Sequence, residues 1–394
     1  MAAIESLGYP SVIEQRVVIV GAGVLGLFTA LELVQDRRVH VIVIEADHPG
    51  SGSSGRSVGM VETQYLSQMD VEVRAFGRRA YAGLERDHDL PFTHGGYLRL
   101  GRTDADVTRF EDSVQLQAGC GINDAEVLSA QEIARRWPHL LTDDLLAGLF
   151  GAWDGYVDGY EVSQLLSRLV REAGGQVHSR SRLISAAHGE AWELRTTTGT
   201  LHADIVVNAA GAWAGLVAQM LRAPIHLVPQ LHGALTIEVP HEWPFTPFVM
   251  DYVPGAGREG VYFRSERKDQ LIAGLHTEEV TRSAVSPDVT LGKMDFETIE
   301  RIVLLLSERL SGIDDIRVGR SWTGIYPMSA DQTPIVGPHS ANPTVVCAVG
   351  AGGNGIQLAP ALGRMAADAI LMRPATFSSD VDWSHARVAA APTS

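Results

Sequence analysis

The sequence predicts an α/β fold with two interleaved domains, one of which is built on a parallel sheet. Three observations support this prediction. A short apolar run at residues 17–20 has the composition of a buried strand, a glycine-rich turn follows it directly, and a second apolar run occupies residues 39–44. The 394 residues of the chain are enough for two domains with a large core.

The glycine-rich turn, with Gly21, Gly23 and Gly26, has the spacing G-x-G-x-x-G and opens a segment of helical length. Gly21 permits a tight turn, Gly23 lets the backbone approach a pyrophosphate, and Gly26 lets the helix pack closely on the strand. Glu45 ends the second strand, where a dinucleotide fold places its ribose-binding carboxylate. The alternatives are a chance glycine turn and a membrane helix over residues 17–34, and the glycines argue against the second.

The composition limits the partners that we expect. A formal net charge of −15 disfavours nucleic acid and anionic membrane surfaces. Cys120 and Cys347 have neither metal-ligand nor disulfide spacing, so we expect no metal site. Residues 1–13 lack the features of a secretory signal, which predicts a cytoplasmic protein without a membrane span, and residues 373–394 resemble a loosely held tail.

The remaining segments alternate between helical and strand patterns. We expect helices over residues 68–86, 104–118, 129–136, 160–173, 296–310 and 356–371. Strands are expected over residues 97–100, 176–179, 183–187, 192–197, 201–203, 205–208, 235–239, 260–264, 271–275 and 344–349. Residues 321–338, which contain three prolines, are expected to form a loop. A second glycine-rich turn at residues 350–355 opens the last helix, so we expect another negative or electron-rich group at that N-terminus.

Five motifs in this order resemble the D-amino-acid oxidase family of flavoproteins, which includes glycine oxidase, monomeric sarcosine oxidase and the sarcosine oxidase β-subunits. They are the first glycine motif with Glu45, SSGRSVG at 53–59, DIVVNAAGAW at 204–213, TGIYPMSADQTPIVG at 323–337 and GAGGNGIQLAPALG at 350–363. The resemblance covers almost the whole chain. It implies FAD, bound non-covalently because Gly324 stands where covalent relatives carry a cysteine.

The resemblance also implies a division into domains. A Rossmann-type FAD-binding domain would comprise residues 12–87, 156–220 and 321–372, with residues 373–394 as a C-terminal tail. An interleaved substrate-binding domain would comprise residues 88–155 and 221–320, built on a large, six-stranded antiparallel sheet that roofs the flavin.

By motif position, the resemblance assigns the cofactor contacts. The ADP half would be held by Gly21, Gly23, Val24, Leu25, Gly26, Glu45 and Ala46, and the backbone of Val177 would face adenine. The pyrophosphate and flavin would lie along Ser53, Ser54, Arg56, Ser57, Ala210, Gly211 and Trp213. The isoalloxazine would lie against Gly324, Gly353, Asn354, Gly355, Ile356 and Gln357.

On the substrate side the chain departs from its relatives. Glu62 and Gln357 stand where sarcosine oxidases carry a carboxylate-binding Arg and Lys, and Tyr326 and Gly353 stand where glycine oxidases carry arginines. Ile272 replaces the oxygen-activating Lys, with Lys268 nearby. The resemblance places His276 and Tyr262 at substrate-facing positions.

Arg264 lies two residues after Tyr262, so both side chains would face the same way on a strand. It could contact a substrate carboxylate or, alternatively, pair with Glu266 at a sheet edge. His276 could instead be a buried, hydrogen-bonded histidine. Glu62 could favour a cationic amine or be a solvated loop carboxylate.

The family chemistry implies oxidation of a C–N bond in an amine or amino acid. A neutral amine gives a hydride to flavin N5, and the imine then hydrolyses. Secondary or N-methyl amines are our first expectation, with O₂ or another electron acceptor as the oxidant, in a homo- or hetero-oligomer. The alternatives are a 2-hydroxy-acid oxidase, a flavin-binding subunit with little activity alone, and a nicotinamide-only enzyme.

Overall fold

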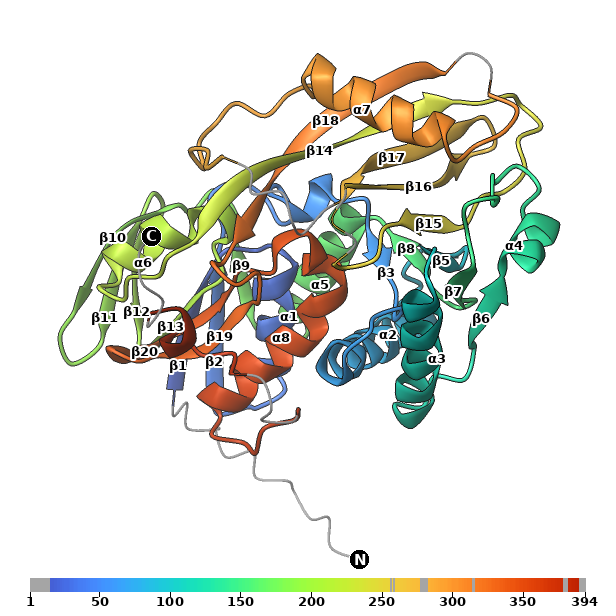
Figure 1. Cartoon of the computed structure of the whole chain (residues 1–394). Helices are drawn as coiled ribbons and strands as arrows, with labels where there is room; N and C mark the ends of the chain where they lie inside the picture. Colours follow the sequence, from blue (N-terminus) through green and yellow to red (C-terminus); the bar gives the residue numbers. More distant parts are fainter. Residues whose placement is uncertain are drawn as a thin grey trace, which may run out of the picture.

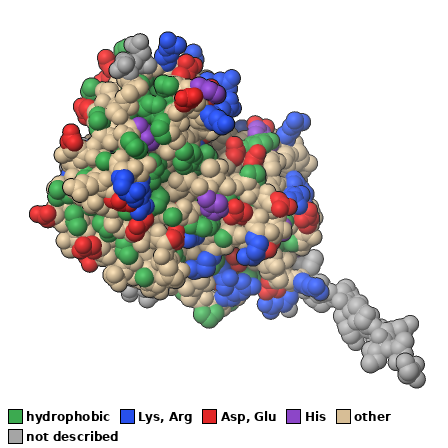
Figure 2. Space-filling model, turned by 90° about the vertical axis from the view of Figure 1, so that its right-hand side faces the viewer, with side chains coloured by type: hydrophobic (Ala, Val, Ile, Leu, Met, Phe, Trp, Pro, Cys, Tyr) green, Lys and Arg blue, Asp and Glu red, His purple; other side chains and the backbone are tan. Residues whose placement is uncertain are grey.

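The computed structural model describes residues 15–255, 257, 259–276, 283–313, 316–377 and 382–389. Residues 1–13, on which the expectation about a secretory signal rests, lie outside these ranges, as does part of the predicted tail. Within them, no helix has the length and apolar character that crossing a membrane requires. On the face shown in Figure 2, acidic and basic side chains are interspersed rather than gathered into a basic surface.

A six-stranded sheet forms the centre of the nucleotide-binding half (Figure 1). Its neighbouring strands are parallel except at the β19–β20 edge, which is antiparallel. In spatial order the strands are β19 (Ile335–His339), β20 (Asn342–Val349), β13 (Ile205–Asn208), β1 (Gln15–Val20), β2 (Val39–Ile44) and β9 (Gln176–His178).

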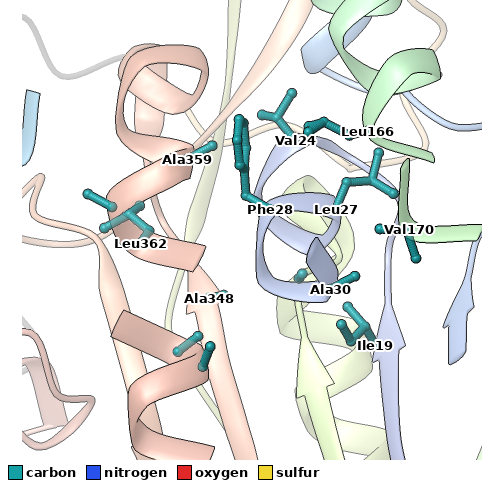
Figure 3. Packing of buried hydrophobic residues seen from close by; sticks show 14 of the residues in the cluster. Ile19, Val24, Leu27, Phe28, Ala30, Leu166, Val170, Ala348, Ala359 and Leu362 are labelled. Atoms are coloured by element: carbon teal, nitrogen blue, oxygen red, sulfur yellow. The ribbon is translucent and has the colours of Figure 1, made fainter. Parts of the chain in front are cut away.

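Both faces of this sheet are covered, as is usual for parallel strands. Val17 and Ile19 face α1 (Val24–Leu33), α5 (Gly159–Glu172) and α8 (Gly355–Ile370), and Figure 3 shows α1 packed between its neighbours. Val18 and Val20 point the opposite way, because side chains alternate along a strand. They pack against α6 (Ala214–Met220) and the meander of β10 (Leu183–His188), β11 (Trp192–Thr196) and β12 (Gly199–Ala203).

The second half is built on an eight-stranded sheet. Its spatial order is β18 (Arg317–Met328), β14 (Val228–Glu238), β17 (Gln270–His276), β16 (Gly260–Arg267), β15 (Phe248–Asp251), β5 (Tyr97–Gly101), β7 (Ala147–Gly151) and β6 (Ala125–Ser129). The expected large sheet is therefore present, but the expectation of six purely antiparallel strands is wrong, because there are eight and β15 pairs with β5 in parallel.

The outer face of the eight-stranded sheet carries a helix, and its inner face looks toward the nucleotide-binding half. α7 (Phe296–Ser307) buries Ile302 and Leu306 against outward-facing Leu235 and Phe263. On the inner face Tyr262 and Arg264 point the same way, as the alternation along β16 predicts.

The remaining elements complete the two halves. They are β3 (Met60–Val61), β8 (Gly155–Val157) and β4 (Phe92–His94), which form a small sheet, the helices α2 (Gln68–His88), α3 (Asp104–Gly119), α4 (Ala130–Arg136) and α9 (Ala386–Ala389), and the short 3₁₀ turns η1 (Ser54–Arg56), η2 (Gly211–Trp213) and η3 (Gly352–Asn354).

The segment expected to be a loop is largely a strand. Residues 321–328 belong to the 12-residue strand β18, and residues 335–338 belong to β19. β18 lies at the edge of its sheet, where a proline removes no needed hydrogen-bond donor, so Pro327 is compatible with a strand. The domain boundary that we predict at residue 321 lies inside β18.

Candidate functional site

A cavity of about 580 Å³ lies between the carboxyl ends of the parallel strands and the inner face of the eight-stranded sheet. Most of the residues that the sequence assigns to the cofactor line it. From the glycine turns and the neighbouring loops these are Gly21, Gly23, Val24, Leu25, Glu45, Ala46, Ser53, Ser54, Arg56, Ser57, Ala210, Gly211, Trp213, Gly324, Gly353, Gly355 and Ile356, with Tyr262 and Tyr326 from the sheet.

The three glycines of the first turn have different local surroundings. Gly21 has φ +110°, and a Cβ there would lie 2.4 Å from the Ala209 carbonyl oxygen. A Cβ on Gly26 would lie 2.0 Å from the Gly21 carbonyl oxygen. A Cβ on Gly23 would meet only Ser54 Oγ, at 3.2 Å, and would project into the cavity wall. The fold therefore requires the first and third glycines, whereas the second keeps the cavity open.

The helices that begin at the cavity lack capping side chains. α2, α3, α4, α5 and α7 each have a side-chain N-cap, from Ser67, Thr103, Ser129, Asp158 and Asp295. α1 and α8 have none, and neither carries an acidic residue in its first turn. Val24 N of α1 donates to Ser54 Oγ at 3.1 Å. The positive dipole ends of both helices suit the pyrophosphate of a dinucleotide and the electron-rich edge of a flavin.

The adenosine end of the cavity differs from the expectation at one position. Glu45 lies there, accepting hydrogen bonds from Ala22 N at 2.9 Å and Asp47 N at 3.0 Å. Val177 does not line the cavity, because it is buried in β9 and its carbonyl accepts a hydrogen bond from Arg171. Ser181, Arg182 and Leu183 line this end, where the chain leaves β9 for the meander.

The opposite end is roofed by aromatic side chains from the large sheet. The His232 ring stacks on Tyr326, with centroids 3.9 Å apart and planes 15° from parallel. Tyr326 also covers Gly353, where a Cβ would lie 2.5 Å from its ring, and Tyr262 is held in place by stacking on Phe248. The sequence did not single out His232, because only its pairing opposite Gly324 across β14 and β18 brings it to the cavity.

Glu62, Asn354 and Gln357 lie together just outside the cavity lining. Gln357 Nε2 donates to Asn354 Oδ1 at 2.9 Å, and Glu62 N donates to Gln357 Oε1 at 3.3 Å. Glu62 is 1% exposed, so the alternative of a solvated loop carboxylate is wrong. Burial raises the pKa of Glu62, although the guanidinium groups of Arg99 and Arg74 oppose this shift.

Arg264 lines a different cavity, of about 390 Å³. Its guanidinium lies 3.4 Å from the centre of the Tyr156 ring, bonds Glu266, and donates to Val58 O at 3.1 Å. The structure thus shows the alternative of pairing with Glu266, but not at a sheet edge, because β16 lies between β17 and β15. Tyr262 and Arg264 share a face but not a cavity, because residues 55–58 contribute to the wall between the two spaces.

His276 and Ile272 lie on β17, and neither lines the large cavity. The His276 ring packs edge-on against Tyr252, with centroids 5.1 Å apart. Burial, with a smaller contribution from Arg99, lowers the pKa of His276 to about 4, so its imidazole is neutral at pH 7. Ile272 lines the smaller cavity beside Arg264, whereas Lys268 is exposed in the β16–β17 turn.

The chain belongs to the family described as DAO, FAD dependent oxidoreductase, whose pattern it matches over residues 16–369. FAD is therefore its cofactor and oxidation–reduction its class of reaction. The uncapped helix N-termini, the open space at Gly23 and the position of Glu45 all fit that group.

The sequence identity to individual known proteins is low. The chain is 27% identical to mouse FAD-dependent oxidoreductase domain-containing protein 1, over 91% of this chain and 81% of that protein. It is 22% identical to glycine oxidase of Bacillus subtilis, over 94% and 95% of the two chains. The fold superposes on L-proline dehydrogenase from P. horikoshii with a TM-score of 0.82 at 22% identity, over 95% and 97% of the chains.

Proposed function

We propose that this protein oxidises the C–N bond of an amine or amino acid, with secondary or N-methyl amines as the preferred class. The observation that carries the proposal is the roof over one end of the cofactor cavity, where His232, Tyr262 and Tyr326 converge from three strands of the large sheet. When bound, FAD supplies the hydride acceptor. Two names among the similar proteins support this substrate class. Glycine oxidase is named for a primary amine, and L-proline dehydrogenase is named for a secondary amine.

We assign His232 to the proton transfer. The C–H bond beside an ammonium group does not readily give up a hydride, because the protonated nitrogen has no lone pair to form the C=N bond. A base must therefore first take the ammonium proton, and a cavity-lining imidazole suits that role. Stacking on Tyr326 fixes the plane of the ring. The hydroxyl-bearing rings of Tyr262 and Tyr326 flank the same space and orient the amine, and their bulk excludes water until the imine has formed.

The arginines near this end favour an amine over a substrate that depends on a carboxylate. Arg264 bonds Glu266 and Val58 in the smaller cavity, and Arg99 donates to Gln64 O and Tyr252 O. Among the described residues that line the large cavity, the arginines are Arg56, beside Gly324, and Arg182, at the adenosine end. Arg56 is therefore the group that we expect to meet any substrate carboxylate.

The smaller cavity favours a second candidate function, a flavin-binding subunit that passes electrons onward. Arg56, Ser57, Val58 and Trp322 line both cavities, so an electron acceptor in the smaller one would be separated from the flavin by little more than one segment of backbone. Isolation of the protein with a second redox subunit would support this candidate. Cytoplasmic location and oligomeric state remain predictions.

Anaerobic bleaching of the flavin tests the proposal. Purified protein is mixed with a panel of secondary, N-methyl and primary amines, with and without a carboxylate, and with 2-hydroxy acids. We expect secondary or N-methyl amines to bleach it fastest, and His232→Asn to slow bleaching by about 10²–10⁴-fold. His202→Asn, at an exposed position on β12, is the matched control. Bleaching by hydroxy acids alone would refute the proposal.

A further inference from the structure

Two buried carboxyl groups lie next to each other between the small sheet and α3, outside the cofactor cavity. Glu62 is 1% exposed and Asp154 is 0% exposed. Gln64 joins them, because its backbone N–H donates to Glu62 Oε2 at 2.5 Å and its side-chain Nε2 donates to Asp154 Oδ2 at 2.7 Å. Glu62 Oε1 is buried and has no hydrogen-bond partner among the described residues.

The hydrogen bonds around Thr63 indicate a proton on Asp154. The Thr63 hydroxyl lies 2.9 Å from Gln117 Oε1 and 3.5 Å from Asp154 Oδ1, but it has only one proton to donate. Gln117 Nε2 donates to Gln64 Oε1 and Ser113 Oγ, so Gln117 Oε1 can only accept. Asp154 Oδ1, which lies 3.8 Å from Arg78 Nη1, gains a hydrogen bond to the hydroxyl if it carries a proton.

The surrounding charges agree with one negative charge on the pair. Arg74 of α2 and Arg99 of β5 act on Glu62, with Asp70 opposing them. Arg78 of α2 lies 3.8 Å from Asp154 but bonds Asp124 at 2.6 Å. Burial, followed by the charge of Glu62, raises the pKa of Asp154 to about 8 against the bonds from Gln64 and Thr63 and the charge of Arg78. Two adjacent buried carboxyl groups do not both ionise readily.

The backbone N–H of Glu62, rather than its carboxyl group, begins a short chain of hydrogen bonds to the flavin end of the cavity. Glu62 N donates to Gln357 Oε1, and Gln357 Nε2 donates to Asn354 Oδ1. Tyr65 OH donates to the same Asn354 oxygen at 2.8 Å. Asn354 is the N-cap of α8, which begins at the cavity lining. The carboxyl pair therefore lies behind the end of the cavity where reduction of FAD adds negative charge.

We propose that Glu62 and Asp154 form a proton-storing pair that, in alkaline solution where the pair has lost its shared proton, couples reduction of the bound FAD to the uptake of one additional proton. The two electrons come from the reductant, one proton goes to the flavin, and a second enters the pair instead of remaining in solvent. Both residues are positioning residues. The inference rests on the FAD site and not on the identity of the oxidised substrate.

Potentiometric titration of the bound FAD with dithionite and mediator dyes, from pH 7 to 10 and without substrate, tests the inference. Below about pH 8, where Asp154 stays protonated in both redox states, the potential should fall with the slope of a single proton per two electrons. Just above that pH the slope should double. Asp154→Asn, which mimics the protonated acid, should keep the single slope throughout.

Two further measurements complete the test. Asp124→Asn is the matched control. It removes a partly exposed carboxylate that bonds Arg78, and it should retain the doubling of the slope seen in the wild type. Photoreduction of weakly buffered wild-type protein at pH 8.5, followed with a pH indicator, should take up clearly more than one proton and up to about 1.8 protons per FAD, because about three quarters of the pairs are unprotonated at that pH. This result does not depend on any variant folding. A single slope in the wild type, uptake of one proton, or a doubled slope in Asp154→Asn would overturn the inference.

Discussion

Gly23 and Gly26 belong to one motif, but their replacement by alanine should affect different properties. At Gly26 the new Cβ would lie 2.0 Å from the Gly21 carbonyl oxygen, a backbone atom held by the tight turn at φ +110°. Since backbone cannot rotate away, α1 must shift, and overpacking of this kind costs about 1–3 kcal/mol. At Gly23 the new Cβ would meet Ser54 Oγ at 3.2 Å, a side-chain atom that rotates easily.

Thermal unfolding of the apoproteins, together with FAD titration followed by flavin fluorescence, separates the two effects. Gly23→Ala should unfold within about a degree of the wild-type apoprotein but bind FAD at least about tenfold more weakly, because its methyl group occupies the pyrophosphate approach. Gly26→Ala should unfold several degrees lower, at ~2–4 °C per kcal/mol. The reasoning fails if Gly23→Ala binds FAD normally or if the Gly26→Ala apoprotein is as stable as the wild type.

Four further outcomes are expected. Acid precipitation should release the flavin, since Gly324 offers no side chain for a covalent link, and flavin in the pellet would contradict this. Arg264→Met should leave the KM of a carboxylate-bearing substrate within about twofold, since its guanidinium bonds Glu266 and Val58, and a steep rise in steady-state KM would place it in the pocket. Reduced wild-type protein should react with oxygen slowly in stopped-flow mixing, because the apolar Ile272 stands where relatives carry the oxygen-activating Lys and cannot stabilise superoxide, so rapid wild-type reoxidation would refute the argument. Burial lowers the pKa of His139 to about 4, so the unfolded chain binds more protons between about pH 4 and 6.5 and stability should fall as pH drops through that window, by up to about 3 kcal/mol. Urea unfolding at pH 7 and pH 5 should show a smaller loss in His139→Gln.

The nucleotide-binding half could be predicted because its residues act locally. A strand, a glycine turn, a helix and a second strand are contiguous in the sequence. The spacing of the glycines can be read from the sequence, and the structure gives the steric surroundings of each. The prediction for β18 failed for the opposite reason. Pro327 lies opposite Pro229 in an edge pairing, and whether a segment lies at a sheet edge depends on pairing with a strand about 100 residues away.

The substrate side was harder to predict, because its residues meet only through long-range register. His232 faces the cavity because β14 pairs with β18, and a lone histidine in LHGAL carries no periodic signal of that pairing. Arg264 lies on the predicted face of β16. The cavity that its side chain enters, however, is decided by the path of residues 55–58, which line that cavity. Asp154 lies between β7 and β8 and meets Glu62 only through Gln64.

The two departures at Glu62 and Gln357 lie side by side. The resemblance places an Arg and a Lys at these positions in sarcosine oxidases, and here the backbone N–H of Glu62 donates to the Gln357 side chain. An Arg at position 62 would bring a third guanidinium beside Arg74 and Arg99, both of which are buried. Like charges in low dielectric repel strongly, so Glu62→Arg alone should destabilise the protein, and Gln357→Lys added to it should worsen the effect. We therefore expect the buried arginines to favour a carboxylate at position 62, and we expect substrate recognition to depend on the His232 side of the cavity.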